Sequence, residues 1–124
     1  MAQRALWFLS LWLLGHAHAQ DAATGLQIIN DRTKGNCVAC HALPGQTGNA
    51  GGISSNFGPA LGGVGKRYNA LQLRQWVTDA RQIKPDTLMP PFGSTTGMTL
   101  PQPATAVLTS EQIDHVVAAL QTWR

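Results

Sequence analysis

The stretch Cys37-Val38-Ala39-Cys40-His41 decides how the rest of this chain is interpreted, because it contains both cysteines of the sequence. A disulfide between cysteines so close together would close too small a loop to stabilise the chain appreciably. A thioredoxin-like redox pair requires a βαβ setting, and no strand pattern precedes the first cysteine. A structural zinc site requires four ligands, and beyond residue 19 the sequence has only one histidine in addition to His41. These three interpretations therefore leave the motif poorly explained.

A covalently attached haem uses both cysteines and the histidine. The two thiols add to the vinyl groups of the porphyrin as thioethers, and the spacing brings the adjacent histidine to the iron. We therefore predict one haem c bound covalently through Cys37 and Cys40, with His41 as an axial ligand of the iron.

The first 19 residues have the composition of a secretory signal peptide. Arg4 gives a positive start, residues 6–14 form a short apolar run, and Ala17-His18-Ala19 fits a signal peptidase site. An uncleaved anchor is the alternative, but the run is shorter than the ~20 residues that span a bilayer. Cleavage after residue 19 leaves 20–124 as one domain, and no later segment is apolar enough to form a membrane helix.

The charge balance beyond residue 19 is nearly even, with eight of the nine Lys and Arg residues against six Asp and Glu. Nucleic-acid binding requires a dense basic surface, so that class of function is excluded. Large aromatic side chains are few for a domain of this size, and a buried porphyrin would supply apolar volume that the core lacks.

Periodic apolar residues predict three helices, over residues 24–34, 69–83 and 109–123, and no segment alternates as a strand would. Asn69 is a suitable N-cap for the second helix, whose apolar face runs to Ile83. Residues 109–112 form a capping box at the start of the third. Two long irregular segments, 45–65 and 84–107, suit a chain that wraps a cofactor. The predicted fold class is all-α.

The second axial ligand has three candidates, namely Met89, Met98 and His115. We favour Met89, because the two prolines that follow it restrict the backbone and would hold a ligand stiffly. Met98 lies in a softer stretch, and His115 lies opposite the apolar stripe of its helix, which predicts an exposed side chain. A His/Met pair raises the reduction potential relative to His/His and fills the sixth coordination position, so it indicates electron transfer.

Pro59 lies 18 residues after His41. From there its carbonyl could accept the Nδ1–H of the histidine and fix the imidazole ring, although a simple turn proline is the alternative.

Several motifs together resemble the SoxX family, the small monohaem cytochromes of the SoxAX sulfur-oxidation complex. The haem pentapeptide alone indicates only a c-type cytochrome, and the family-specific part is the ordered series that surrounds it. The similar segments are residues 35–41, 56–59, 63–68, 73–77, 86–92 and 108–113, which are spread along nearly the whole chain beyond the signal peptide.

The resemblance implies a class I cytochrome c fold with crossing first and last helices, where Gly25 would allow close approach to Val116 or Leu120. It also implies His41/Met89 ligation and a periplasmic location. In that family the partner SoxA holds the haem that links thiosulfate oxidatively to a cysteine of the carrier SoxYZ. This L-cysteine S-thiosulfotransferase passes its electrons through SoxX to a soluble cytochrome. One departure is the segment 94–106, which is poorer in aromatic and charged residues than the resemblance implies.

Two other functions stay open on the sequence alone. A free-standing electron shuttle would dock its partners through a basic cluster of Lys66, Arg67, Arg74 and Arg81, although these side chains could equally cover a solvated helix face. An enzyme acting alone at the iron would require an open sixth coordination position.

Overall fold

The computed structural model describes residues 20–45, 57–101 and 103–124, and the predicted signal peptide lies outside these ranges. The elements are α1 (Ala22–Asn30), η1 (Cys37–Ala39), α2 (Val64–Arg67), α3 (Ala70–Asp79), η2 (Ala80–Gln82) and α4 (Ser110–Thr122). These ranges contain no strand, in agreement with the predicted all-α class. None of their helices is long and apolar enough to cross a membrane.

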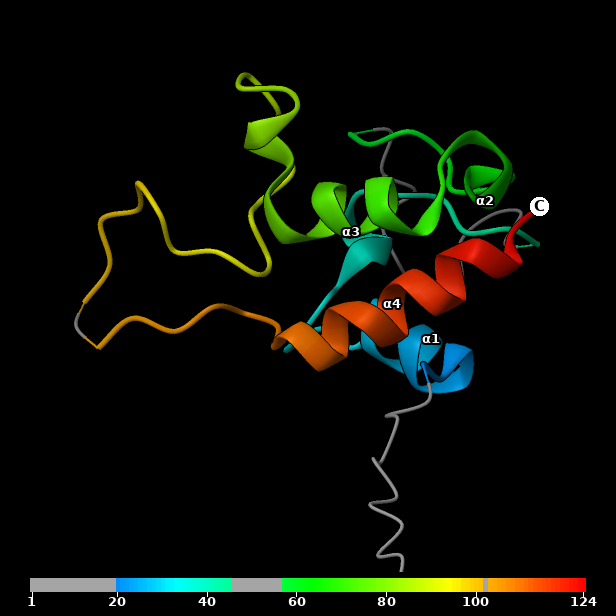
Figure 1. The fold of residues 1–124 in the computed structure, drawn as a ribbon, viewed down its shortest axis with the longest axis horizontal. Helices are drawn as coiled ribbons and strands as arrows, with labels where there is room; N and C mark the ends of the chain where they lie inside the picture. The colour runs from blue at the N-terminus through cyan, green and yellow to red at the C-terminus, as the bar shows by residue number, and fades with distance from the viewer. Residues whose placement is uncertain (1–19, 46–56, 102) are drawn as a thin grey trace, which may run out of the picture.

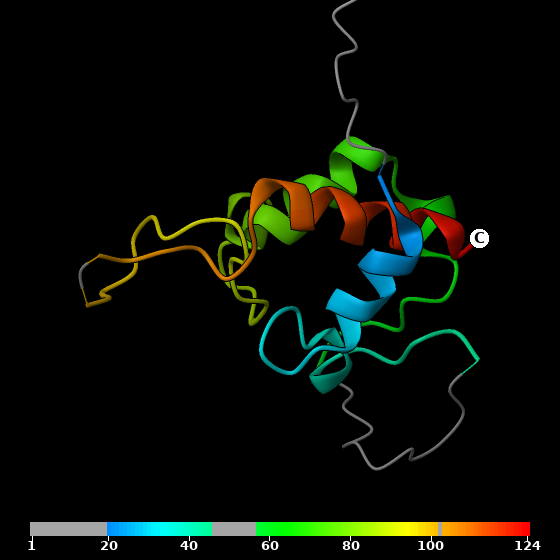
Figure 2. The same ribbon diagram turned by 90° about the horizontal axis from the view of Figure 1, so that it is seen from below.

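Helices α1 and α4 cross at the centre of the molecule (Figures 1 and 2). Gly25 lies at the crossing, where an added Cβ would be 2.5 Å from the carbonyl carbon of His115 and 3.0 Å from Cβ of Ala119. The close approach predicted for Gly25 is therefore present. The residues that face Gly25 are His115 and Ala119, each one position before the Val116 and Leu120 that were expected.

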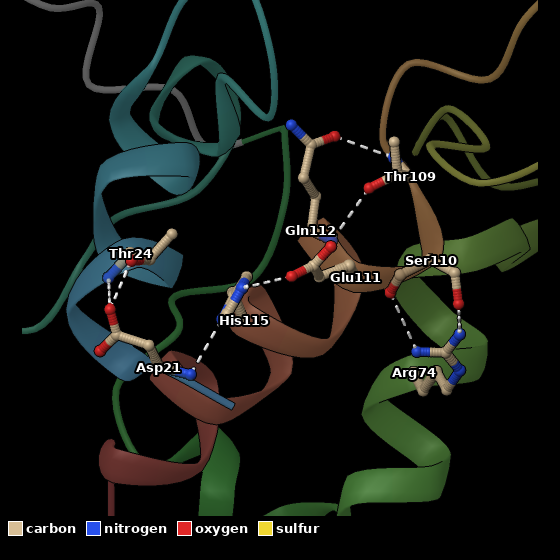
Figure 3. A network of polar contacts seen from close by, with 8 residues as sticks. All are labelled: Asp21, Thr24, Arg74, Thr109, Ser110, Glu111, Gln112 and His115. Carbon is tan, nitrogen blue, oxygen red and sulfur yellow. Dashed lines mark hydrogen bonds and ion pairs between the residues drawn. The ribbon is translucent and has the colours of Figure 1, made fainter. Parts of the chain in front are cut away.

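The crossing covers most of His115, contrary to the expected exposed side chain. Only 15% of its side chain is exposed, and its Nδ1 accepts a hydrogen bond of 2.9 Å from the backbone N–H of Asp21 (Figure 3). The Asp21 carboxylate in turn caps α1 by accepting from the N–H groups of Ala23 and Thr24. The start of α1 is thus tied to the middle of α4, and the prediction was wrong because it considered the face of one helix alone.

Helix α3 packs along α4 on the side away from α1 (Figure 1). Arg74 joins the two helices, since it forms an ion pair with Asp114 and donates a 2.7 Å hydrogen bond to Oγ of Ser110 (Figure 3). The most deeply buried large side chains of the shared core are Ile29, Leu108, Ile113 and Val116.

Both predicted helix caps on this pair are confirmed. Asn69 and Thr109 each accept from the N–H three residues on, and the side-chain oxygens of Gln72 and Gln112 accept in return from the N–H of the cap residue. These reciprocal pairs are capping boxes, which satisfy backbone groups that the first turn leaves without partners. Only the box at Thr109 was predicted as such, whereas Asn69 was predicted as a simple N-cap.

The ends of two helices differ from the prediction. Helix α1 covers 22–30 rather than 24–34, because the Asp31 carboxylate accepts from the N–H of Thr33 and turns the chain toward the cysteines. Helix α3 ends at Asp79, whose backbone is extended, and the single turn η2 follows. Ile83 consequently lies beyond the helix and is 44% exposed.

Helix α2 was not predicted, and it depends on contacts with the end of α4. The N–H of Gly65 donates to the carbonyl of Trp123 at 2.9 Å, and Val64 is buried in the common core. A four-residue helix has no periodicity to read, so its position follows from tertiary packing.

Candidate haem-binding site

The C-x-x-C-H motif follows α1 after a tight turn through Asn36, which has a left-handed backbone (φ 45°). The motif itself forms the single turn η1, in which the N–H groups of Cys40 and His41 both donate to the carbonyl of Cys37 at 3.1 and 2.9 Å. Both thiols are free, and that of Cys40 is exposed while that of Cys37 is half-buried. The turn therefore leaves two separate sulfurs available for thioether bonds.

Burial raises the pKa of the Cys37 thiol to about 11. At neutral pH this sulfur is protonated, whereas a redox-active dithiol or a metal-bound cysteine requires ready access to the thiolate. Within the ranges that the structure describes, no group of three or more His, Cys, Asp or Glu side chains could hold a metal ion. The cysteines thus suit covalent attachment of a cofactor better than thiol redox chemistry.

The ring of His41 is held by the segment 57–61. Its Nδ1 lies 2.7 Å from the carbonyl oxygen of Pro59, and because a carbonyl only accepts, Nδ1–H is the donor. This tautomer leaves the Nε2 lone pair available for a metal. Gly58 lies against the same ring, since an added Cβ would be 2.7 Å from Nδ1 and 2.9 Å from Nε2. Only a residue without a side chain fits there.

Two backbone hydrogen bonds fasten that segment to the haem motif. The N–H of Gly58 donates to the carbonyl of Cys40 at 2.8 Å, and that of Leu61 to Ala42 at 2.9 Å. Arg67 closes the other side, since its guanidinium donates to the carbonyls of Ala60 and Gly62 at 3.0 and 2.7 Å. Arg67 was expected among the surface cations, because carbonyl acceptors leave no trace in a side-chain pattern.

The two methionine candidates lie in different surroundings. Met89 is half-buried and packs against the hydrophobic core, and its N–H donates to Oγ1 of Thr87 at 3.2 Å. Pro91, two residues further on, is buried. Met98 is 42% exposed, beyond the core. The structure thus favours Met89 over Met98 as the residue held in a fixed position, while ligation by either sulfur remains a prediction.

These residues fit a haem c. Two free thiols, an imidazole whose Nδ1–H is already bonded and a half-buried thioether are the donor types that such a group requires. A large apolar side chain of the segment 57–61 lies open to solvent, since Phe57 is 75% exposed, as expected of a residue placed to cover an apolar macrocycle.

An all-helical fold with crossing terminal helices and this donor set defines a c-type cytochrome. The family model "Cytochrome c" matches residues 22–123. Among solved structures, a chain of SoxXA from P. pantotrophus is similar with a TM-score of 0.71 and 31% identity, over 83% of this chain and 81% of that one. A comparison with curated proteins found no match.

The chain belongs to the cytochrome c family, as a class I member of SoxX type that binds haem c covalently. The predicted fold class, family resemblance and cofactor are confirmed, while the roles of the individual site residues remain proposals.

Proposed function

We propose that this chain is the electron-accepting haem subunit of a SoxAX-type complex, itself without a catalytic site. A SoxA-like cytochrome would be its permanent partner, and a SoxYZ-like carrier would supply the cysteine that receives thiosulfate. The observation that carries this proposal is the similarity to a SoxXA chain over more than four-fifths of both chains. Export to the periplasm, after removal of residues 1–19, is part of the same proposal.

In this proposal Cys37 and Cys40 hold the haem through thioethers, and His41 and Met89 provide the axial ligands. The group supplies a one-electron carrier whose potential depends on its axial ligands and their hydrogen bonds. The chain contributes orientation, since Pro59 accepts the Nδ1–H of His41 and so fixes the ring and increases its basicity. Packing against the core holds Met89 in place, so the sixth position would be filled and no substrate would reach the iron.

The free-standing shuttle finds less support in the side-chain contacts. Three of the four cations expected to dock its partners bind groups of their own chain. Arg67 binds backbone carbonyls, Arg74 binds Asp114, and Arg81 binds Asp79. Charges that are already paired contribute less to long-range steering of a partner.

Reduction of the purified haem protein by thiosulfate tests the proposal. We expect reduction only when a SoxA-like cytochrome and a SoxYZ-like carrier from the same organism are both present. Omission of either protein is the control. Equal rates of reduction by thiosulfate without the SoxA-like protein, or absence of any complex with it, would reject the proposal in favour of the shuttle.

A further inference from the structure

Residues 93–101 and 103–107 form an arm that extends from the helical body in both views (Figures 1 and 2). Its two ends meet at a closed base, where the N–H of Leu108 donates to the carbonyl of Phe92 at 2.8 Å. The N–H of Gly93 donates to Thr78 of α3 at 3.0 Å, which fastens the same base to the helices. The arm therefore leaves the body and returns to it at one point.

A brace from the body holds the near half of the arm. Asp79 is 5% exposed, and its two carboxylate oxygens accept from Nε and Nη2 of Arg81 at 2.8 and 2.7 Å. The same guanidinium donates to the carbonyl of Thr96 at 2.8 Å. A buried carboxylate thus fixes an arginine that supports the arm, so the arm is built into the fold although residues 96–99 are exposed.

The surface of this arm carries no charge. No Asp, Glu, Lys, Arg or His occurs between Asp86 and Glu111, in a chain of which 12% is charged. Met98 and Val107 are 42% and 54% exposed, and two arm prolines are exposed as well. Such a surface can be covered without desolvating an ion, and cores of permanent interfaces show the same depletion of charge.

The arm continues directly from the segment that holds Met89. Leu88, next to that methionine, is 82% exposed and belongs to the same uncharged stretch. A protein seated on Leu88 and on the arm would therefore lie beside the segment proposed to supply the distal ligand. Electron transfer from a permanent partner requires this kind of closeness.

We propose that Leu88 and the arm form the docking surface for the SoxA-like cytochrome, which would present an uncharged apolar face to them. This inference rests on the proposed function. It assigns a role to residues 94–106, the segment that has fewer charged and aromatic residues than the resemblance to the SoxX family implies.

The test measures the dissociation constant between the haem-loaded chain and the SoxA-like cytochrome of the same organism. Met98→Asp and Val107→Asp place one charge on the arm. Leu71→Asp is the matched control, because Leu71 is 67% exposed and lies at the start of α3, outside the arm. We expect each arm variant to weaken binding at least about tenfold, and the control to stay within about twofold of the parent.

Thermal unfolding and the haem spectrum of each variant establish that it is folded and loaded. Hydrogen exchange on the unaltered chain gives a second measurement that needs no variant, and we expect the arm amides to gain protection in the complex. Arm variants that bind as tightly as the parent, or arm amides that stay unprotected, overturn the inference.

Other results separate this inference from the proposed function. If the parent binds no SoxA-like cytochrome, the proposed function fails and the inference with it. If the parent binds but arm charges have no effect, only the inference fails. A homodimer that the arm variants dissociate, with partner binding intact, would assign the arm to a second copy and also overturn it.

Discussion

A methyl group added at Gly25 tests the crossing of α1 and α4 directly. In Gly25→Ala the new Cβ would lie 2.5 Å from the carbonyl carbon of His115 and 3.0 Å from Cβ of Ala119. The obstacle is helix backbone, which cannot rotate away as a side chain can. Overpacking of a core costs about 1–3 kcal/mol, and a backbone obstacle belongs at the upper end of that range.

The gain in helix propensity from Gly to Ala offsets about 1 kcal/mol of this cost. We therefore expect Gly25→Ala to lower the free energy of unfolding by about 2 kcal/mol. For a domain of this size the thermal midpoint should fall by about 8 °C or more. Circular dichroism during chemical and thermal unfolding of the haem-loaded protein measures both quantities.

Gly62→Ala is the matched control, because no atom beyond the two neighbouring residues lies within 4 Å of its added Cβ. That substitution restricts the unfolded chain, so we expect stability unchanged or raised by up to about 1 kcal/mol. If Gly25→Ala unfolds at the same denaturant concentration as the parent, then α1 and α4 do not meet at His115 and the described crossing is wrong.

Three further outcomes are expected from the site and the brace. Gly58→Ala displaces the His41 ring from Pro59 and so removes the hydrogen bond that increases the basicity of the imidazole. The reduction potential should therefore rise by on the order of 60 mV in a redox titration, and an unchanged potential contradicts this. Carbon monoxide should bind the reduced Met89→Ala protein and not Met98→Ala, and equal binding would reject the assignment. Because arginine hydrogen bonds hold the pKa of Asp79 at about 2, its stabilising effect is present above its ordinary pKa and lost as pH falls through 2. Asp79→Asn should therefore unfold at lower temperature than the parent at pH 7, with the difference shrinking below pH 4; a constant difference contradicts the ion pair.

The starts of two helices could be predicted because their signals are local. Asn69 and Thr109 each bond to a residue three positions on, so the residues that make the cap lie within one short window of sequence. The same holds for haem attachment, since both thiols and the histidine predicted as proximal ligand lie within five residues of the chain. Short-range chemistry of this kind needs no knowledge of tertiary structure.

Features set by distant contacts could not be predicted. His115 bonds to Asp21 across 94 positions, and an apparently exposed side chain is mostly covered there. Arg67 binds two carbonyls of the segment that holds the His41 ring, and backbone acceptors are invisible in a side-chain pattern. The carbonyl of Pro59 was found from its spacing, but the glycine beside it, against the imidazole ring, was not.

The distribution of charge connects these observations to the choice of partner. Electrostatic steering of a transient partner requires cations that are free to face it, and its rate falls as salt screens them. In this chain Arg67, Arg74 and Arg81 bind their own carbonyls and carboxylates, whereas the segment after Asp86 exposes apolar side chains and carries no charge. Association through that segment would depend on burial of apolar surface and would change little with ionic strength. A cytochrome built in this way is better suited to remain with one partner than to exchange among several, and this favours a subunit of a complex over a diffusing shuttle.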